Sequence, residues 1–324
     1  MKKLLKNNEI YLLIILIVLS LIIGSINKEF LTLENFFDLL KSSSIMSIMA
    51  IGFLIVLISG GIDVSFAAIA TVSMYTTVTI LNKFGGNIVF AFIIASLIGI
   101  ILGSVNALLI SYFKIPTLIA TLGTMNVFHA LVLVIGKKAH IADIPETIVD
   151  FGKGMIFSFE NNRGQEFGLS YLSMVMIIIF IITWAILKYT SLGRNIYALG
   201  GSFEAAKRVG ISTWKVQLFI YCYMGFLSGI AGLLKVALMR YVNSFDLVGT
   251  EIDIIATVVL GGAAIFGGVG SVIGTVLGIA LLTMLKSSLI LVGIPSEWDY
   301  AIIGIVIIIS ILVMNYKERS KRLI

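Results

Sequence analysis

The chain has 324 residues, of which 59% are hydrophobic and 12% are charged, and its formal net charge is +6. A soluble domain is closer to about 25% charged, so this composition excludes a chain folded around one soluble core. It predicts an all-α integral membrane protein. The basic residues are spread over loops, which favours the positive-inside bias of membrane proteins over nucleic-acid binding. We expect a single membrane domain over residues 1–324.

Apolar runs predict about ten transmembrane helices. In chain order they cover 11–26, 45–59, 65–81, 88–112, 116–135, 169–187, 214–238, 252–267, 271–292 and 298–315. The first run is long for a cleaved signal peptide and lacks a convincing A-x-A site, which favours a retained helix. The charged stretch 27–44 suggests an interfacial segment. The run 252–267 covers only about 24 Å of a core about 30 Å thick, so it either stops inside the membrane or continues into buried glycine-rich chain.

Lysine and arginine set the orientation of these spans. With an even number of spans and an inner N-terminus, more of them fall in inner segments than in outer ones, which predicts that both termini are cytoplasmic. The longest outer segment, 136–168, is polar. It either contacts an extracytoplasmic partner or is a passive loop, and the sequence favours the loop.

A short polar island at 200–212 lies on the predicted inner side. Gly200 and Gly201 allow a turn, Ser202 can cap a helix, and Gly210 can end it in a left-handed conformation. The resulting helix of about two turns is too short to be stable alone. Apolar contacts are offered by Phe203, Val209 and Ile211, and charge by Lys207 and Arg208. We interpret the island as a cytoplasmic coupling helix that seats in a partner; the alternative is an ordinary capped loop. Its candidate residues are Ser202, Phe203, Glu204, Ala205, Ala206, Lys207, Arg208 and Gly210.

Two glycine-rich breaks interrupt the apolar sequence. In the first, Gly60 and Gly61 end a helix, and Asp63 and Ser65 can cap the next one. Such a break at membrane depth must be buried in protein or line a wet cavity, so it either lines a pathway or is a capped cytoplasmic turn; the residues alone favour the turn. The second break contains Gly261, Gly262, Gly267, Gly268 and Gly270.

Glycines four residues apart predict close helix packing, within the subunit or across a dimer. They are Gly99 and Gly103, Gly225 and Gly229, and Gly270, Gly274 and Gly278. In addition, residues 96–103 resemble 271–278, and an Ile-Pro pair follows each. The two copies run in opposite directions through the predicted membrane, which indicates an inverted internal repeat. Chance similarity between glycine-rich helices is the alternative.

The sequence offers no pattern for catalysis or metal binding. Cys222 is the single cysteine, which excludes an intrachain disulfide, and His129 and His140 are isolated. We find no paired carboxylates, no Ser/His/Asp set and no Walker A motif, so we expect no enzyme activity, no metal and no cofactor on this chain. Four ionisable residues lie near predicted helix ends, where snorkelling or helix capping is enough to explain them without a functional role: Lys235, Asp253, Lys286 and Asp299.

Several motifs in fixed order carry a family resemblance. They are residues 60–65 (GGIDVS), 115–125 (IPTLIATLGTM), 192–211, 259–262 (VLGG) and 267–271 (GGVGS). The chain resembles the permease subunits of bacterial ABC importers for ribose, xylose, galactose and autoinducer-2. It departs from the family pattern at residues 66–68, where relatives often have small residues with a glycine.

The resemblance implies a type II ABC importer-like fold and a location in the bacterial inner membrane. It implies a homo- or heterodimer of permeases, cytoplasmic ATPase subunits that bind the ATP and dock on residues 204–210, and an outer binding protein that delivers a sugar. With the breaks, two residues of the 115–125 motif complete our pathway candidates: Gly60, Gly61, Asp63, Ser65, Thr121, Gly123, Gly261 and Gly262. The alternative is an ion-coupled secondary transporter with Asp63 as the coupling group.

Overall fold

The computed structural model describes residues 8–136, 140–161, 164–291 and the single positions 298, 301, 304, 305 and 308. The first half contains α1 (Asn8–Ile26), η2 (Lys28–Leu31), α2 (Leu33–Ile58), α3 (Phe66–Phe84), α4 (Ile88–Ser111) and α5 (Thr117–Gly136). A small extramembrane segment follows, with β1 (His140–Ile141), α6 (Glu146–Lys153), β2 (Met155–Glu160) and β3 (Glu166–Ser170). The second half contains α7 (Tyr171–Tyr189), α8 (Ser191–Gly201), α9 (Phe203–Arg208), α10 (Thr213–Met239), β4 (Val242–Asn243), α11 (Thr250–Leu260) and α12 (Val272–Leu291).

Six of these helices are long and apolar enough to cross a membrane, namely α1, α2, α4, α5, α7 and α10. The prediction of a multi-pass, all-helical membrane protein is therefore confirmed. The number ten stays a prediction, because the last expected span, 298–315, lies outside the described residues except for five positions.

Polar residues set where several helices begin. The side chains of Thr32, Asn87 and Ser170 accept hydrogen bonds from backbone N–H groups in the first turns of α2, α4 and α7. Each of these bonds satisfies a donor that has no partner within the helix. Polar residues at these points therefore divide the apolar sequence into separate helices.

The expected start of the second span at residue 45 is wrong. A single helix of 26 residues begins at Leu33 and runs to Ile58, so α2 includes the stretch that we expected to lie outside the span. The hydroxyls of Ser43 and Ser44 donate to the carbonyl oxygen of Leu40 one turn earlier. These polar side chains are satisfied by the helix itself, and they do not end it.

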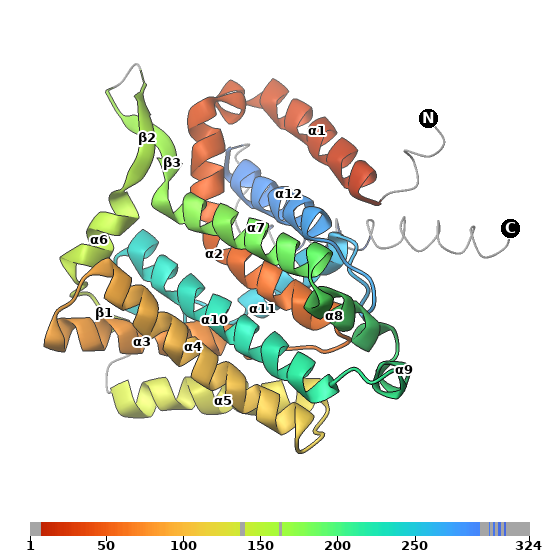
Figure 1. Ribbon diagram of the computed structural model, residues 1–324. Coiled ribbons are helices and arrows are strands. Elements are labelled where there is room, and N and C mark those ends of the chain that lie inside the picture. Colours follow the sequence, from red (N-terminus) through yellow and green to blue (C-terminus); the bar gives the residue numbers. More distant parts are fainter. Residues whose placement is uncertain are drawn as a thin grey trace, which may run out of the picture.

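The centre of the molecule is formed by α2 and α10, with α4 and α5 on one side and α12 and α1 on the other (Figure 1). Residues 47–58 of α2 are fully buried. α4 and α10 cross in close contact: a Cβ added at Gly99 would overlap the carbonyl oxygen of Gly225, and one added at Gly103 would overlap that of Tyr221. The prediction that spaced glycines serve close helix packing is confirmed at this crossing.

Gly225→Ala should destabilise the protein by about 1–3 kcal/mol, because the new methyl group would overlap the carbonyl oxygen of Gly99 on α4. Unfolding of the purified protein in detergent measures this. Gly123→Ala is the matched control: Gly123 is also helical, but nothing lies within 4 Å of its added Cβ, so this variant should be as stable as the unmodified protein or slightly more stable. Equal stabilities of the two variants would contradict the prediction.

The helix pairings bear on the inverted repeat. If α2–α4 and α10–α12 are equivalent units, α4 corresponds to α12, and each should pack against the preceding helix of its own unit and against the first helix of the other unit. This is observed: α4 packs against α3 and α10, and α12 packs against α11 and α2. The matched glycines differ, however. Gly99 and Gly103 face α10, whereas Gly274 and Gly278 face α11. Because the second copy continues beyond the described residues, its superposition on the first stays a prediction.

The segment after α5 is more ordered than a passive loop. α6 packs closely on α10, where a Cβ at Gly152 would overlap the carbonyl oxygen of Ala237. The β2–β3 hairpin is tied to the start of α2, since Asn161 Nδ2 donates to both carboxylate oxygens of Glu34 at 3.1 and 3.2 Å. The hairpin exposes Phe157 and Phe159. The segment is thus fixed to the membrane domain and presents aromatic side chains outward.

Candidate functional site

The polar island forms the short capped helix that the sequence predicts. α9 has six residues, and the Ser202 hydroxyl accepts a hydrogen bond from the backbone N–H of Ala205 at 3.2 Å. Gly210 has a φ of +83°, and the next N–H, of Ile211, donates to the carbonyl oxygen of Ala206. Both ends of the helix are therefore closed, as we expected from Ser202 and Gly210.

Most of α9 faces outward. Ala206 is buried, while the other α9 residues are exposed, including Phe203 at 44%; the adjoining Val209 is 76% exposed. Lys207 and Arg208 are also exposed. Ile211, in contrast, is half-buried and packs against the hydrophobic core. α9 is thus a rigid projection held by one small contact and its flanking chain.

Backbone segments from three distant parts of the sequence meet directly beside α9. The backbone N–H of Gly268 donates to the carbonyl oxygen of Ile58 at 2.8 Å. A Cβ at Gly200 would overlap that same oxygen, and one at Gly267 would lie 2.7 Å from the Cα of Gly60. We call Gly60, Gly200, Gly201, Gly267 and Gly268 the glycine junction. At this junction the first glycine-rich break (Gly60) and the second (Gly267 and Gly268) both meet Gly200 and Gly201, which directly precede the cap of α9.

Positive backbone angles explain part of the glycine content of the junction. Gly60 and Gly267 have φ values of +82° and +87°, which other residues adopt at an energetic cost. The hydroxyl of Tyr197 on α8 also donates to the carbonyl oxygen of Gly270 at 2.7 Å. The sequence shows that each segment is rich in glycine, but it contains no signal that the three segments meet.

Hydroxyl groups on α5 accept hydrogen bonds from the backbone of the first glycine-rich break. The backbone N–H groups of Ile62 and Val64 donate to the hydroxyls of Thr117 and Thr121 at 3.1 and 3.3 Å. Donors freed by the helix break are therefore paired with threonines from another helix and do not face lipid. Thr121, a predicted pathway residue, is thus part of the same unit as Gly60 and Gly61.

Asp63 is 1% exposed and lies at the start of a chain of buried hydrogen bonds. Its Oδ1 accepts from the N–H and from the hydroxyl of Ser65, both at 2.7 Å. Its Oδ2 is buried without a hydrogen-bond partner among the described residues. The expectation that Ser65 caps α3 is wrong: its side chain makes no capping bond and joins Asp63 to α4.

The chain of hydrogen bonds continues through two residues that we did not predict. Asn106 Nδ2 donates to the Ser65 hydroxyl, and Thr124 donates to Asn106 Oδ1, both at 2.7 Å. The signal was present in the sequence, because Asn106 is an amide inside a strongly apolar span. The network Asp63–Ser65–Asn106–Thr124 links the first break to α4 and α5.

The remaining pathway candidates lie apart from this network. Gly123 is exposed on α5, with nothing within 4 Å of an added Cβ. Gly261 packs against Gly274 at the end of α11, and Gly262 closes that helix with an N–H bond to Val259. α11 ends at Leu260, so the predicted span 252–267 is wrong in its second part, where the chain leaves the helix.

Charged residues near the helix ends are paired. Lys286 on α12 contacts Asp253 on α11 at 2.6 Å, and Lys235 lies 3.9 Å from Asp246. Asp299 lies outside the described residues. Within the described part of the chain, His, Cys, Asp and Glu do not gather in groups of three or more that could hold a metal ion.

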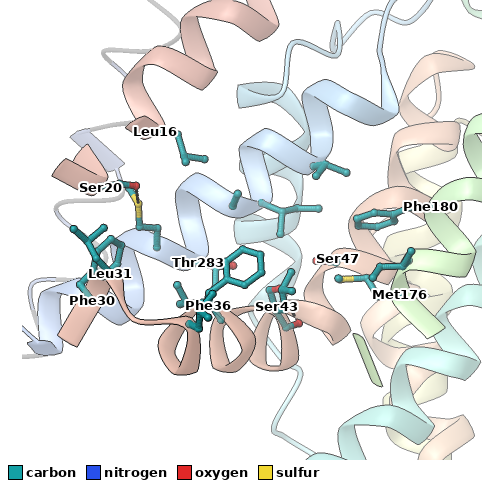
Figure 2. Close-up of a pocket in the computed structure, with 18 of the residues that line it drawn as sticks. Leu16, Ser20, Phe30, Leu31, Phe36, Ser43, Ser47, Met176, Phe180 and Thr283 are labelled. Atoms are coloured by element: carbon teal, nitrogen blue, oxygen red, sulfur yellow. Dashed lines mark hydrogen bonds between the residues drawn. The ribbon is translucent and has the colours of Figure 1, made fainter. Parts of the chain in front are cut away.

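An apolar cavity of about 550 Å³ lies between α1, α2, α7 and α12 (Figure 2). Its lining is mostly hydrocarbon, with five hydroxyl side chains, of which those of Ser20, Thr32 and Ser43 donate within the protein; the other two are Ser47 and Thr283. A sugar needs several polar partners when it is buried, and a lining of this kind supplies few. The cavity therefore suits hydrocarbon and is not our candidate for the solute site.

Comparison with known proteins shows which family the chain resembles. Residues 35–311 match the family model described as branched-chain amino acid transport system / permease component. The chain is 31% identical to the ribose import permease protein of Escherichia coli (strain K12), over 94% of this chain and 93% of that protein. It is 29% identical to the autoinducer 2 import system permease protein of Yersinia pseudotuberculosis, over 98% of this chain and 88% of that protein. No solved structure matches the chain significantly.

Proposed function

The chain belongs to the family of branched-chain amino acid transport system permease components, and from this premise we propose that it is the membrane subunit of an ATP-driven sugar importer. The relatives named for ribose and autoinducer 2 import support a sugar or a sugar-like solute. The chain forms the pathway in a bacterial inner membrane, with both termini in the cytoplasm. It performs no catalysis and binds no cofactor, because its ATPase partners bind the ATP.

The observation that carries this proposal is the attachment of α9. An exposed, capped helix of six residues is held directly against the glycine junction, and the junction includes the break that leads to Asp63. A partner that binds α9 therefore acts on the chain where α2 ends and α3 begins. An importer needs such a point, because only differential binding of partners to two states can drive alternating access.

Three further partners complete the proposed importer. A second permease subunit, identical or different, forms the other half of the pathway. A soluble binding protein delivers the sugar to the outer face, and the exposed aromatic residues of the β2–β3 hairpin, Phe157 and Phe159, support a docking role for that segment. Membrane lipid surrounds the apolar helices.

The double variant Phe203→Asp, Arg208→Glu should abolish co-purification of the ATPase and reduce uptake at least about tenfold, because it removes an apolar contact and reverses a charge at one docking site. Co-purification from membranes and uptake in cells measure this. Phe245→Asp is the matched control, since Phe245 is also exposed but lies in the loop between α10 and α11. Normal docking and uptake in the double variant would contradict the proposed coupling role of α9.

The second candidate is an ion-coupled secondary transporter, which the buried Asp63 with its unpartnered oxygen favours. Purified protein in liposomes separates the two functions. The importer requires the ATPase and ATP for uptake, whereas the secondary transporter concentrates solute from an ion gradient alone.

A further inference from the structure

A second exposed apolar surface lies at the same end of the molecule as α9. Between α11 and α12, the side chains of Ile265, Phe266 and Val269 are 49%, 93% and 59% exposed. We call these three residues the turn patch. Their turn is held rigidly: Ala264 N–H donates to the carbonyl oxygen of Val269, and Gly267 N–H donates to that of Ala264, both at 3.0 Å. The exposure of Phe266 is therefore imposed by a fixed backbone.

The turn patch is joined to α9 through the glycine junction. A Cβ at Gly268 would lie 3.2 Å from both the Cα and the N of Gly201, and Gly201 directly precedes the α9 cap Ser202. Figure 1 shows the connection between α11 and α12 at the end of the molecule where α8 and α9 lie. The turn patch and the exposed residues of α9, Phe203 and Val209, therefore stand on either side of one junction.

The surroundings of the turn patch favour a protein partner over lipid. Non-helical backbone does not face hydrocarbon, and the turn is joined through the glycine junction to α8 and α9. The exposed charged residues of these two helices are mostly basic: Arg194, Lys207 and Arg208 against the acidic Glu204. An apolar surface with a charged rim is typical of an interaction site. Complete burial of a phenylalanine side chain contributes about 1.5–3 kcal/mol, which is enough to make Phe266 an anchor.

We propose that the turn patch is a second docking element for the cytoplasmic ATPase subunit, which seats Phe266 in an apolar pocket with an acidic rim while it holds α9. This inference rests on the proposed function. The basic rim selects this partner over a second copy of the chain, because a two-fold interface at this surface would bring the like charges of both copies together. One ATPase subunit would then contact α9 on one side of the glycine junction and the turn patch on the other, with the end of α2 between these two contacts.

Site-directed photocross-linking tests the occupant of the turn patch. In a Cys222→Ala background, which removes the single cysteine, cysteines introduced by Phe266→Cys, Phe203→Cys or Phe245→Cys carry a benzophenone maleimide. The permease is labelled in membranes that lack the ATPase, and the purified cognate ATPase is then added before irradiation. We expect ATPase adducts from positions 266 and 203 and none from position 245.

Each other outcome identifies what fails. An ATPase adduct from 203 together with a permease–permease adduct, a lipid adduct or no adduct from 266 overturns the docking role of the turn patch and leaves the proposed function intact. The absence of ATPase adducts from both positions overturns the proposed function and this inference with it.

Binding of the purified ATPase gives a second readout. Phe266→Asp should weaken binding to the permease in nanodiscs about tenfold, which corresponds to about 1.4 kcal/mol. Because Phe266 is almost fully exposed, the substitution should leave the melting temperature unchanged. Phe245→Asp should bind as the unmodified protein does. Equal affinities of the two variants would overturn the inference.

Discussion

Replacing Gly200 by alanine should destabilise the protein by about 3 kcal/mol and reduce ATP-driven uptake more than tenfold. The added Cβ would overlap the carbonyl oxygen of Ile58 and lie 2.6 Å from the backbone nitrogen of Gly268. Both neighbours are backbone atoms, so neither can move aside by a change of rotamer. Relief requires α8 to separate both from the end of α2 and from the turn that contains Gly268.

The adjacent glycine provides the control for this experiment. Gly201 is in the same helix, but an added Cβ there would have nothing within 4 Å. Gly201→Ala should therefore stay within about 0.5 kcal/mol of the unmodified protein. Unfolding in detergent and uptake in cells are measured for both variants. If Gly200→Ala behaves as Gly201→Ala does, the glycine junction is not a close backbone contact and does not transmit movement.

We expect the second large loss of stability from a substitution of Asp63. Asp63→Ala removes the acceptor of two buried hydrogen bonds from Ser65 and should destabilise the protein by about 2–4 kcal/mol. Asp63→Asn keeps an oxygen for both bonds, so it should retain most of the stability and most of the ATP-driven uptake. Unfolding and uptake assays on both variants check this. Ser59→Ala is the control in the same break, since its hydroxyl bonds only to its own helix, at the carbonyl oxygen of Val56.

The asparagine variant also separates the two candidate functions. In an importer, Asp63 acts through the geometry of its hydrogen bonds, which the amide oxygen of asparagine reproduces. In an ion-coupled transporter the carboxylate itself exchanges the coupling ion, so Asp63→Asn abolishes uptake although the protein folds. Uptake lost in a stable Asp63→Asn protein would therefore support the secondary transporter.

The sequence predicted well those elements whose signals are local. Ser202 and Gly210 mark the ends of α9 because capping and left-handed termination depend on residues close in the chain. Asn87, which we did not predict as a cap, begins α4 through a bond of the same local kind. The start of α2 was missed, because its charged and hydroxyl residues look interfacial in sequence, whereas in the helix Ser43 and Ser44 bond to the preceding turn.

The candidate site depends on contacts that sequence patterns do not encode. Gly60, Gly200 and Gly267 are far apart in the chain, and a glycine has no side chain whose chemistry would indicate its neighbour. Asn106 and Thr124 were open to prediction as polar residues in apolar helices, but the bonds from Asn106 to Ser65 and from Thr124 to Asn106 depend on how α3, α4 and α5 pack. The resemblance to sugar importer permeases, which the family match together with the ribose and autoinducer 2 relatives confirms, did not supply these contacts.

The glycine junction also determines how faithfully a mechanical input is passed on. Side chains absorb small displacements by rotating about their torsions, whereas main-chain atoms in direct contact have no such slack. In the proposed importer, the contacts of Gly200 with Ile58 and of Gly267 with Gly60 would therefore pass a shift of α9 on to the end of α2 with little loss. Residues without side chains would thus make the least compliant contact between these segments.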